Sequence, residues 1–579
     1  MLQWQRFLPF LRWIPELKKA GVIQADIIAG VTVALVLIPQ SMAYAQLANL
    51  PAYYGLYAAF LPVIVAALFG SSNQLMTGPV AVVSLLTASA LAPLAVSGSD
   101  QFVAYAILLS FLVGVFQLLL GVFRLGVVLN FLSHPVIVGF TNAAALIIAF
   151  SQFYKLFGVN KPETGVFVTD VIDVLSQIGN THWLSFGMAV VAIGIMVMFK
   201  RFWPKIPGVL FAVIITTVTS YIIDFEGLGG VVVGAIPEGL PTITLPGFDF
   251  SIIPQLIGSA IIISLIGFME AISIAKAMAA RTKQRINVNQ ELIGQGLANI
   301  VGSFSQSYPT SGSFSRSAVN LNAGAITGFS SVVTAVVVLI TLLFLTPLLY
   351  HLPAAVLASV IMMAVMGLIN FKAIKHAWHA HKHDGIAAGV TFVGTLGFAP
   401  HLEWGIIIGI ALALGLYLFR TMRPRVAILG RYKDGTLRDI AIHPELATDN
   451  RLVAVRFDGS LYFANVSYFE DAILMAESEN PDVKFILVVG DAINQLDASG
   501  EEVLRHLVER LKETGVTLVF SGLKRQIILV LKHTGTWDII GDENIFATEE
   551  MALKNIYERL SDGTNDDEPR PLHPLPTPL

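Results

Sequence analysis

The stretch from Ser307 to Gly324 constrains this chain most, because it is polar and lies between apolar segments of membrane-spanning length. Non-helical backbone at membrane depth is tolerated only where protein or a water-filled cavity covers it. Pro309 and Gly312 interrupt the preceding helix, and Ser313 is a suitable N-cap residue for a following one, as is Ser315. We therefore predict a short helix that begins in mid-membrane, where its free N–H groups and positive dipole end form an anion site.

Arg316 adds a full positive charge at this point of the sequence. A charged side chain at the bilayer centre costs about 2.5–3.5 kcal/mol on insertion scales, so it requires either a partner or a functional reason. The sequence therefore makes Arg316 a candidate ligand for the anion.

The composition places the chain among multi-pass membrane proteins. Of its 579 residues, 55% are hydrophobic and 13% are charged, whereas a soluble domain averages about 25% charged residues. The absence of cysteine excludes disulfides and thiolate chemistry. No nucleophile–base pair, phosphate loop or basic nucleic-acid-binding face is present, so no enzymatic activity, cofactor, metal or nucleic-acid partner is expected. Residues 1–24 form an amphipathic segment that either packs on the first span or anchors at the membrane surface.

Hydropathy indicates about fourteen apolar segments, two of them short. They lie near residues 25–45, 52–69, 79–96, 101–121, 134–157, 182–199, 207–223, 252–275, 287–304, 313–328, 329–348, 353–370, 383–398 and 403–420. Together they predict a transmembrane domain over residues 25–425, in contact with the lipid bilayer.

The loops between these segments differ in charge. One set is basic and carries Arg124, Lys200, Arg201, Lys205, Arg281, Lys283, Arg285, Lys372, Lys375, Lys382, Arg420, Arg423 and Arg425. The opposite set carries Asp100, Asp170, Asp173, Asp224, Glu226, Glu238 and Asp249, with Lys161 as the main exception. Because basic loops stay on the cytoplasmic side, both termini are expected to be cytoplasmic.

An internal repeat is visible around two Gly/Ser-rich loops. Residues 55–80 contain an apolar span, a polar loop from Gly70 to Gln74 and the start of a short helix, and residues 296–315 repeat this order. With an odd number of spans in each half, the halves have opposite orientation, so two short helices approach the midplane with their N-termini facing. A chance match between Gly/Ser-rich loops is the alternative.

After Arg425 the pattern becomes that of a small soluble α/β domain, expected over residues 430–560. The expected strands are Leu452–Phe457, Leu461–Val466, Val483–Val489 and Val516–Phe520. The expected helices are Ser467–Ala476, Gly500–Glu513, Leu523–Lys532 and Thr548–Leu560. Residues 561–579 are rich in Asp and Pro and are expected to form a disordered tail.

Several other polar groups fall within the apolar segments. Gln40 and Tyr44 lie one helical turn apart after Pro39, either at a site or in hydrogen bonds between helices. Glu270 is the carboxylate set furthest into a span, and is either functional or paired with Lys276. Three further carboxylates lie in first turns, where a small boundary error would place them in water: Glu291, Asp384 and Glu403.

Two polar patterns outside the apolar segments have simpler explanations than a functional site. His376, His379, His381 and His383 occur in a stretch expected to be a basic cytoplasmic loop, which favours solvated histidines over a metal site. Ser499 and Glu502 have capping-box spacing and are expected to begin a helix with Ser499 as its N-cap.

Four motifs together resemble the SulP sulfate permease family. They are Ile38–Ala45, Thr77–Pro79, Glu270–Lys276 and Gly312–Asn320. The soluble domain resembles a STAS domain, named after sulfate transporters and anti-sigma-factor antagonists. Its Asp497–Gly500 segment resembles the phosphorylation motif of those antagonists, but Ala498 stands where many of them have serine, so phosphorylation is not inferred from this motif.

The resemblance implies a seven-plus-seven inverted repeat like that of uracil permease, and a homodimer. It also implies a mobile core of spans 1–4 and 8–11, a gate of spans 5–7 and 12–14, and elevator-like alternating access. Carried over by motif, the anion site consists of Gln40, Tyr44, Gly78, Pro79, Val80, Ser313, Phe314, Ser315 and Arg316. Glu270 corresponds to the proton-linked carboxylate of the proton-coupled members.

The expected function is that of a secondary transporter for a small oxyanion in a bacterial inner membrane, with proton-coupled sulfate uptake first. Sodium-coupled bicarbonate transport and proton-coupled dicarboxylate transport are alternatives, because backbone dipoles and one arginine suit all of these anions. An uncoupled anion channel, or a sensor that signals through the STAS domain, remains a different class.

Overall fold

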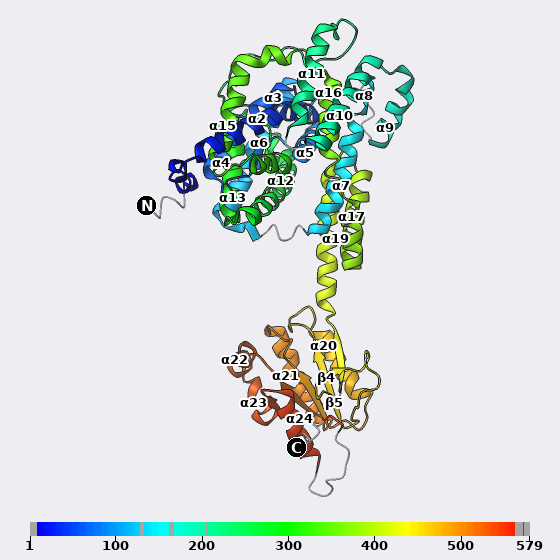
Figure 1. Ribbon diagram of the computed structural model, residues 1–579. Coiled ribbons are helices and arrows are strands. Elements are labelled where there is room, and N and C mark those ends of the chain that lie inside the picture. Colours follow the sequence, from blue (N-terminus) through cyan, green and yellow to red (C-terminus); the bar gives the residue numbers. More distant parts are fainter. Residues whose placement is uncertain are drawn as a thin grey trace. The chain divides into compact units, whose positions relative to one another are not determined.

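The computed structural model describes residues 8–127, 133–160, 167–203, 206–237, 239–432, 434–561 and 571–572. The chain divides into two compact units, Met1–Ala413 and Leu414–Leu579 (Figure 1). The first is helical and the second contains a mixed sheet with helices on it, so the predicted fold class is confirmed. Residues 1–7, Lys161, Lys205, Glu238 and nearly all of the predicted tail lie outside the described residues.

The first half of the membrane unit contains nine described α-helices and one short strand. They are α2 (Val22–Leu47), α3 (Tyr53–Ala58), α4 (Leu61–Phe69), β1 (Met76–Gly78), α5 (Ala81–Leu91), α6 (Asp100–Val122), α7 (His134–Ser151), α8 (Phe153–Phe157), α9 (Phe167–Ser176) and α10 (Trp183–Phe202).

The unit continues with a second set of helices and a second short strand. They are α11 (Gly208–Ile222), α12 (Ile253–Thr282), α13 (Val288–Phe304), β2 (Ser311–Ser313), α14 (Phe314–Asn322), α15 (Phe329–Ile340), α16 (Ala354–Val365), α17 (Phe371–Ala380), α18 (Lys382–Gly397) and α19 (Leu402–Met422). After α15 the helix continues as a π-helical turn over Thr341–Leu345 and a 3-10 turn over Thr346–Leu349.

Seven helical stretches in the described part are long and apolar enough to cross a membrane. They are Val22–Leu47, Asp100–Val122, His134–Phe157, Trp183–Phe202, Ile253–Thr282, Phe329–Leu349 and Leu402–Met422. Shorter apolar stretches of helix cover Tyr53–Phe69, Ala81–Leu91, Gly208–Ile222 and Ala354–Val365. The large apolar side chains that remain exposed on these helices fit a lipid-facing surface.

Each of the fourteen predicted segments contains a helix, but several differ in detail. The second is broken between α3 and α4, the fifth is divided into α7 and α8, and the tenth begins with the last residue of β2, while β1 lies directly before the third. We predicted a basic, histidine-containing loop after the twelfth segment. This prediction is wrong, because Phe371–Ala380 forms helix α17. Asn370 caps this helix by accepting a hydrogen bond from the Ala373 N–H, a local signal that outweighs the charged composition.

Two groups of helices pack mainly within themselves. In one group, α13 lies against α4 and α6, α15 lies against α2, and α12 lies against α5 and α6. In the other, α18 lies against α7 and α17, and α10 lies against α11 and α16. The N-terminal segment adds Trp13, which is buried and lies beside Gly328, so this part of the segment packs on the membrane unit.

The two matching repeat segments meet as an antiparallel strand pair. Met76 pairs with Ser313, Thr77 with Gly312, and Gly78 with Ser311. Because β1 leads into α5 and β2 leads into α14, both short helices begin at this pair and leave it in opposite directions. The predicted meeting of two helix N-termini is thus realised through a pair of strands that the sequence did not indicate.

The second unit contains a six-stranded sheet in the order β4-β3-β5-β6-β7-β8. Its strands are β3 (Val426–Arg431), β4 (Leu437–Asp439), β5 (Leu452–Phe457), β6 (Phe485–Val489), β7 (Thr517–Ser521) and β8 (Ile545–Phe546). Its helices are α20 (Val466–Ser478), α21 (Ala498–Glu513), α22 (Arg525–Thr534), α23 (Thr536–Ile540) and α24 (Glu549–Leu560). Strands β5 to β8 are parallel, whereas β3 is antiparallel to both of its neighbours.

Two local predictions in this unit are wrong. Leu461–Val466 is not a strand, because Asn465 closes a turn by accepting from the Tyr462 N–H and donating to the Ser460 carbonyl. The N-cap of α21 is Asp497 and not Ser499: its carboxylate accepts from the Gly500 N–H at 2.8 Å and from the Phe463 N–H. An aspartate two residues earlier thus begins the helix.

Candidate functional site

The candidate site lies where α14 begins, beside the strand pair. Ser313 occupies the N-cap position as expected, although its hydroxyl lies 3.3 Å from that of Ser315 and makes no capping hydrogen bond. Arg316 follows in the first turn of the helix, with none of its surface exposed. Two flanking contacts hold the segment: Ser317 accepts from the Met76 N–H at 2.9 Å, and Ser311 donates to the Gly267 carbonyl at 2.5 Å.

The Arg316 guanidinium is buried without a hydrogen-bond acceptor. In the described part of the chain, none of its three side-chain nitrogens has a hydrogen-bond partner and no carboxylate forms an ion pair with it. A buried cation in this condition is strongly destabilising for a protein. The side chain therefore has the full capacity of its planar fork available for an oxyanion.

Gly78 provides the space beside this guanidinium. A Cβ atom added at Gly78 would lie 3.4 Å from Nη2 of Arg316 and 3.7 Å from Cδ1 of Leu37. Its φ angle of 147° also lies in a region that side chains disfavour. Pro79 and Val80 follow in the same buried segment, and Val80 is the N-cap residue of α5.

Three side chains lie close enough to Arg316 to interact with it electrostatically: Tyr44 on α2, Tyr308 before β2, and Glu270 on α12. We predicted Tyr44 and Glu270, but missed Tyr308, which is buried and whose hydroxyl lies 3.2 Å from that of Ser84. The sequence could have indicated Tyr308 as a site residue, because it lies inside the polar stretch Ser307–Gly324. Neither the two hydroxyls nor the carboxylate forms a hydrogen bond with the cation.

A cavity of about 810 Å³ reaches the same region. Glu270 and Phe314 line it, as does Val82 in the first turn of α5, so both short helices and α12 contribute to its wall. Oε2 of Glu270 is buried and has no hydrogen-bond partner among the described residues. Lys276 also lines the cavity, but no ion pair joins it to Glu270 in that part of the chain, so the structural pair considered from sequence is not formed.

The remaining predicted residues are arranged less uniformly. Gln40 is buried, and its side-chain oxygen has no partner in the described part of the chain. Phe314 and Ser315 are exposed, in contrast to the buried Arg316 that follows them. The structure thus brings Tyr44, Gly78, Glu270 and Arg316 together, while no contact of Gln40 with this group is seen among the described residues.

A buried polar network positions the strand pair. Gln295 donates to the Thr77 hydroxyl at 2.8 Å, and Asn299 accepts from the Thr310 N–H at 2.8 Å. Glu291 is buried as well, and accepts from the Ser71 N–H at 2.7 Å and the Ser72 N–H at 3.1 Å. Glu291 is therefore not at a solvated helix end, because the repeat loop folds back over it. Asp384, by contrast, is exposed.

No group of three or more metal-ligating side chains occurs in the described part of the chain. His376 and His379 are exposed on α17, and His381 and His383 lie with ring centroids 4.9 Å apart. Nδ1 of His381 and Nδ1 of His383 are buried without a hydrogen-bond partner among the described residues, so the expectation of solvated side chains fits only His376 and His379.

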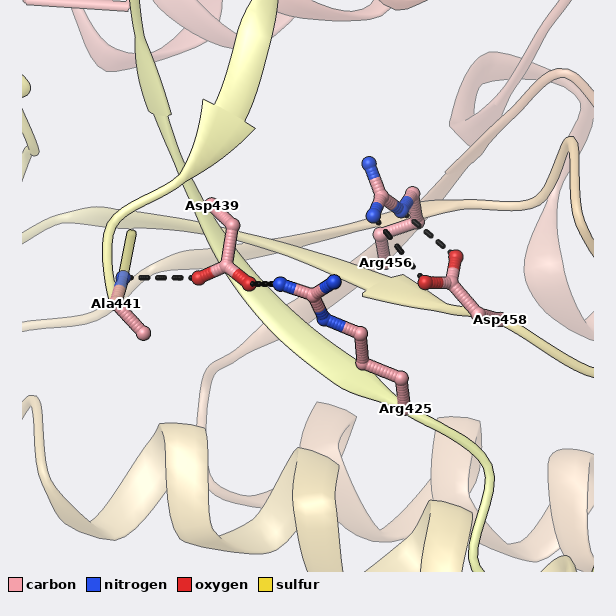
Figure 2. Close-up of polar contacts among 5 residues, drawn as sticks. All are labelled: Arg425, Asp439, Ala441, Arg456 and Asp458. Atoms are coloured by element: carbon pink, nitrogen blue, oxygen red, sulfur yellow. Dashed lines mark hydrogen bonds and ion pairs between the residues drawn. The ribbon is translucent and has the colours of Figure 1, made fainter. Parts of the chain in front are cut away.

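The soluble unit has its own polar cluster, on β3, β4 and β5 (Figure 2). Arg425 donates to Asp439 at 2.5 Å, and Asp439 also accepts from the Ala441 N–H at 2.8 Å. Burial alone would raise the pKa of Asp439, but the hydrogen bonds from Ala441 and Arg425 outweigh burial, so the pKa is lowered. The hydrogen bond to Asp458 raises the pKa of Arg456. Each arginine here has a carboxylate partner.

Comparison with known proteins identifies both units. The family model described as the sulfate permease family matches residues 23–391, and the STAS domain model matches residues 443–552. The chain belongs to the sulfate permease family. The STAS match covers strands β5 to β8 of the sheet, whereas β3 and β4 precede it, and the permease match includes every residue of the candidate site, from Gln40 to Arg316.

Relatives in this family align along nearly the whole chain. "Sulfate transporter 4.1, chloroplastic" of Arabidopsis thaliana is 33% identical over 97% of this chain and 84% of its own length. "High affinity sulfate transporter 1" of Stylosanthes hamata is 33% identical over 95% of this chain and 86% of its own length. Both carry the name of sulfate transporters.

Solved structures of similar fold include SLC26A9 and the transmembrane domain of a bicarbonate transporter. A structure of SLC26A9 matches with a TM-score of 0.88 at 24% identity, over 97% of this chain and 94% of that chain. The transmembrane domain of the cyanobacterial bicarbonate transporter BicA matches with a TM-score of 0.58 at 22% identity, over 69% and 98%. At these identities the likeness establishes the fold alone.

Proposed function

We propose that this sulfate permease family member is a secondary active transporter of a small oxyanion, with sulfate first and a proton as the coupled ion. One observation carries the proposal: the Arg316 guanidinium is fully buried, has no acceptor among the described residues, and lies where a short helix begins. The relatives named as sulfate transporters favour sulfate as the first anion to test.

The coupling proposal concerns Glu270. Its carboxylate lies within electrostatic range of Arg316 and lines the cavity that reaches α14. Ionised, it offsets the arginine and repels an arriving anion; protonated, it leaves the arginine free to bind. Binding of a proton and binding of an anion then favour each other, as linkage requires.

The conformational proposal assigns the two packing groups to a mobile core and a gate. The core contains α2 to α6 and α12 to α15, and the gate contains the other spans, with elevator-like movement of one against the other in a homodimer. The separate packing of the two groups supports this division. We further propose that the N-terminus and the STAS domain face the cytoplasm, which the basic loops support.

The decisive experiment is sulfate uptake into proteoliposomes with and without an imposed pH gradient, for the wild type and Glu270→Gln. The variant keeps the cavity and imitates the protonated side chain, so it should bind sulfate with weaker pH dependence and lose proton-driven accumulation. The control is Glu403→Gln, which removes a carboxylate at the start of α19 that does not line the cavity.

If Glu270→Gln concentrates sulfate as the wild type does, the proton-coupling proposal is wrong. Accumulation that follows a sodium gradient would favour sodium coupling instead. Dissipation of any imposed sulfate gradient, without accumulation, would identify a channel, and no movement of any tested anion would identify a sensor. Competition by bicarbonate and succinate in the same assay tests the alternative substrates.

The sidedness is tested separately with single cysteines, since the natural chain contains none. Asp249→Cys, in the exposed loop before α12, should react with an impermeant thiol reagent from outside intact cells, and Lys512→Cys only after the membrane is opened. Equal labelling of both from outside would contradict the proposed orientation. Asp562, a site suggested by sequence for the same purpose, lies outside the described residues.

A further inference from the structure

The last spanning helix ends in a basic, aromatic segment that the transport site does not use. From Gly405 to Phe419, α19 contains no charged residue, and three arginines then occur within six positions, at Arg420, Arg423 and Arg425. Tyr417 and Phe419 are more than half exposed just before them. Aromatic residues followed by arginines mark the level of lipid headgroups at the end of a transmembrane helix.

This helix end belongs to the second compact unit, Leu414–Leu579, which also contains the STAS domain. Asn465, at the start of α20, fixes it there by donating to the Thr421 carbonyl at 3.3 Å and the Ser460 carbonyl at 2.9 Å. A cavity of about 610 Å³ lies between the helix end and the segment that follows β5, from Asp458 to Asn465. Arg420, Arg423 and Arg425 line it.

The charges around this cavity do not cancel. Arg425 is paired with Asp439, and Asp458, the carboxylate in the lining, accepts from Arg456 at 2.7 and 3.2 Å (Figure 2). In the described part of the chain, Arg420 and Arg423 have no carboxylate partner. Their contacts are with aromatic rings: Arg420 lies 5.9 Å from the Tyr417 ring and Arg423 lies 5.3 Å from the Phe419 ring.

We propose that this cavity binds the phosphate group of an anionic lipid headgroup. Arginine forks bind phosphate oxygens in two-point geometry, and ring stacking leaves their N–H edges free to do so. The position of the cavity favours a lipid as the source of this phosphate. Arg420 lies at the end of a membrane-spanning helix, where lipid headgroups are present. The site is separate from Arg316 and does not depend on the proposed transport function.

The test measures lipid binding to the full-length protein in neutral detergent micelles by native mass spectrometry. Short-chain phosphatidylglycerol is titrated, with phosphatidylcholine of the same chain length as the neutral comparison. The double variant Arg420→Gln with Arg423→Gln should bind phosphatidylglycerol about 30-fold more weakly. Each arginine near a membrane surface raises the affinity for anionic lipid by a similar factor, and the two losses multiply.

Two further double variants act as controls. Lys512→Gln with Arg525→Gln removes the same charge from exposed positions elsewhere on the STAS domain, and should leave binding unchanged. Arg420→Lys with Arg423→Lys keeps both positive charges and should retain part of the lipid affinity. Retained affinity in this variant would show that the loss in the glutamine variant comes from the missing charges and not from misfolding.

Equal phosphatidylglycerol affinity in the wild type and the Arg420→Gln, Arg423→Gln variant would overturn the proposal. Equal loss in the Lys512→Gln, Arg525→Gln variant would overturn it too, since net charge alone would then explain binding. Glycerol 3-phosphate and inorganic phosphate are added as soluble competitors. If either competitor displaces the lipid at equal concentration, the proposal of a lipid ligand is wrong, and the cavity binds a free phosphate compound instead.

Discussion

The arginines of the two units are arranged in opposite ways. In the STAS unit, Arg425 is about half exposed and still has Asp439 as a partner, and Arg456 has Asp458 (Figure 2). In the membrane unit, Arg316 is fully buried and has no carboxylate partner in the described chain. Stability alone would favour the reverse arrangement, because a buried unpaired charge costs far more than an exposed one.

This contrast indicates what each arginine contributes. The STAS pairs complete hydrogen bonds within a folded domain, so their removal should affect stability. Arg316 instead carries an unfavourable free energy that an anion can relieve, so its removal should affect binding. Four substitutions test this distinction, beginning with the largest expected effect.

Arg316→Gln should weaken sulfate binding by about 1.5–3 kcal/mol, the range for hydrogen bonds to charged groups. Thermal stability without anion should stay the same or rise, because the uncompensated buried charge is gone. Isothermal titration and thermal unfolding of the same purified variant measure both effects. A fall in stability together with unchanged affinity would make Arg316 a structural residue and remove the contrast.

Gly78→Ala should weaken binding by about 1–3 kcal/mol, since it combines backbone strain at φ 147° with a new atom 3.4 Å from Nη2 of Arg316. Gly312→Ala is the matched change on the other strand. Its Cβ would meet Leu75 at 2.8 Å and the Ala271 backbone at 3.0 Å, so it should lower stability rather than affinity. Similar affinity losses in both variants would mean that the strand pair responds as one unit.

Asp439→Ala should lower the stability of the STAS domain by about 1–2 kcal/mol, because the carboxylate accepts from the Ala441 N–H and from Arg425. The folded pKa of Asp439 is lowered, so its contribution is present above the unfolded pKa and is lost as pH falls through the folded value. Urea unfolding at pH 7 and at progressively lower pH should therefore show the two proteins converging in acid. A constant difference would contradict the pKa assignment.

Asp458→Ala should have the smallest effect, about 0–1 kcal/mol, because the Arg456–Asp458 pair is partly exposed. Its contribution should decrease with added salt. A loss as large as that of Asp439→Ala would show that exposure does not separate the two pairs.

The sequence predicted the candidate site better than its supporting network. Polar composition and helix-breaking residues located the start of α14, and the cost of placing a charge inside a membrane was enough to single out Arg316. Tyr308 and Glu291 act through partners far away in the chain, Ser84 and Ser71. Hydropathy periodicity does not contain such contacts, since it reports only which residues share a face.

Local rules also failed where two signals competed. Ser499 and Glu502 fit a capping box, but Asp497 forms hydrogen bonds to both Gly500 and Phe463, and the second of these bonds depends on the tertiary fold. In α17, lysine and histidine suggested a loop although alanine and the Asn370 cap favoured a helix. Boundaries and caps are decided by such neighbours, whereas the apolar length of a span is a property of the segment itself.

The strand pair also sets an order for biosynthesis. β1 finds its hydrogen-bond partners in β2, which is synthesised more than 230 residues later. At roughly 5–20 residues per second, the first strand waits on the order of 10–50 s before its partner exists. Throughout that interval the unpaired backbone of Met76–Gly78 needs water or another protein beside it, so insertion of this chain depends on an environment that shelters an unfinished site.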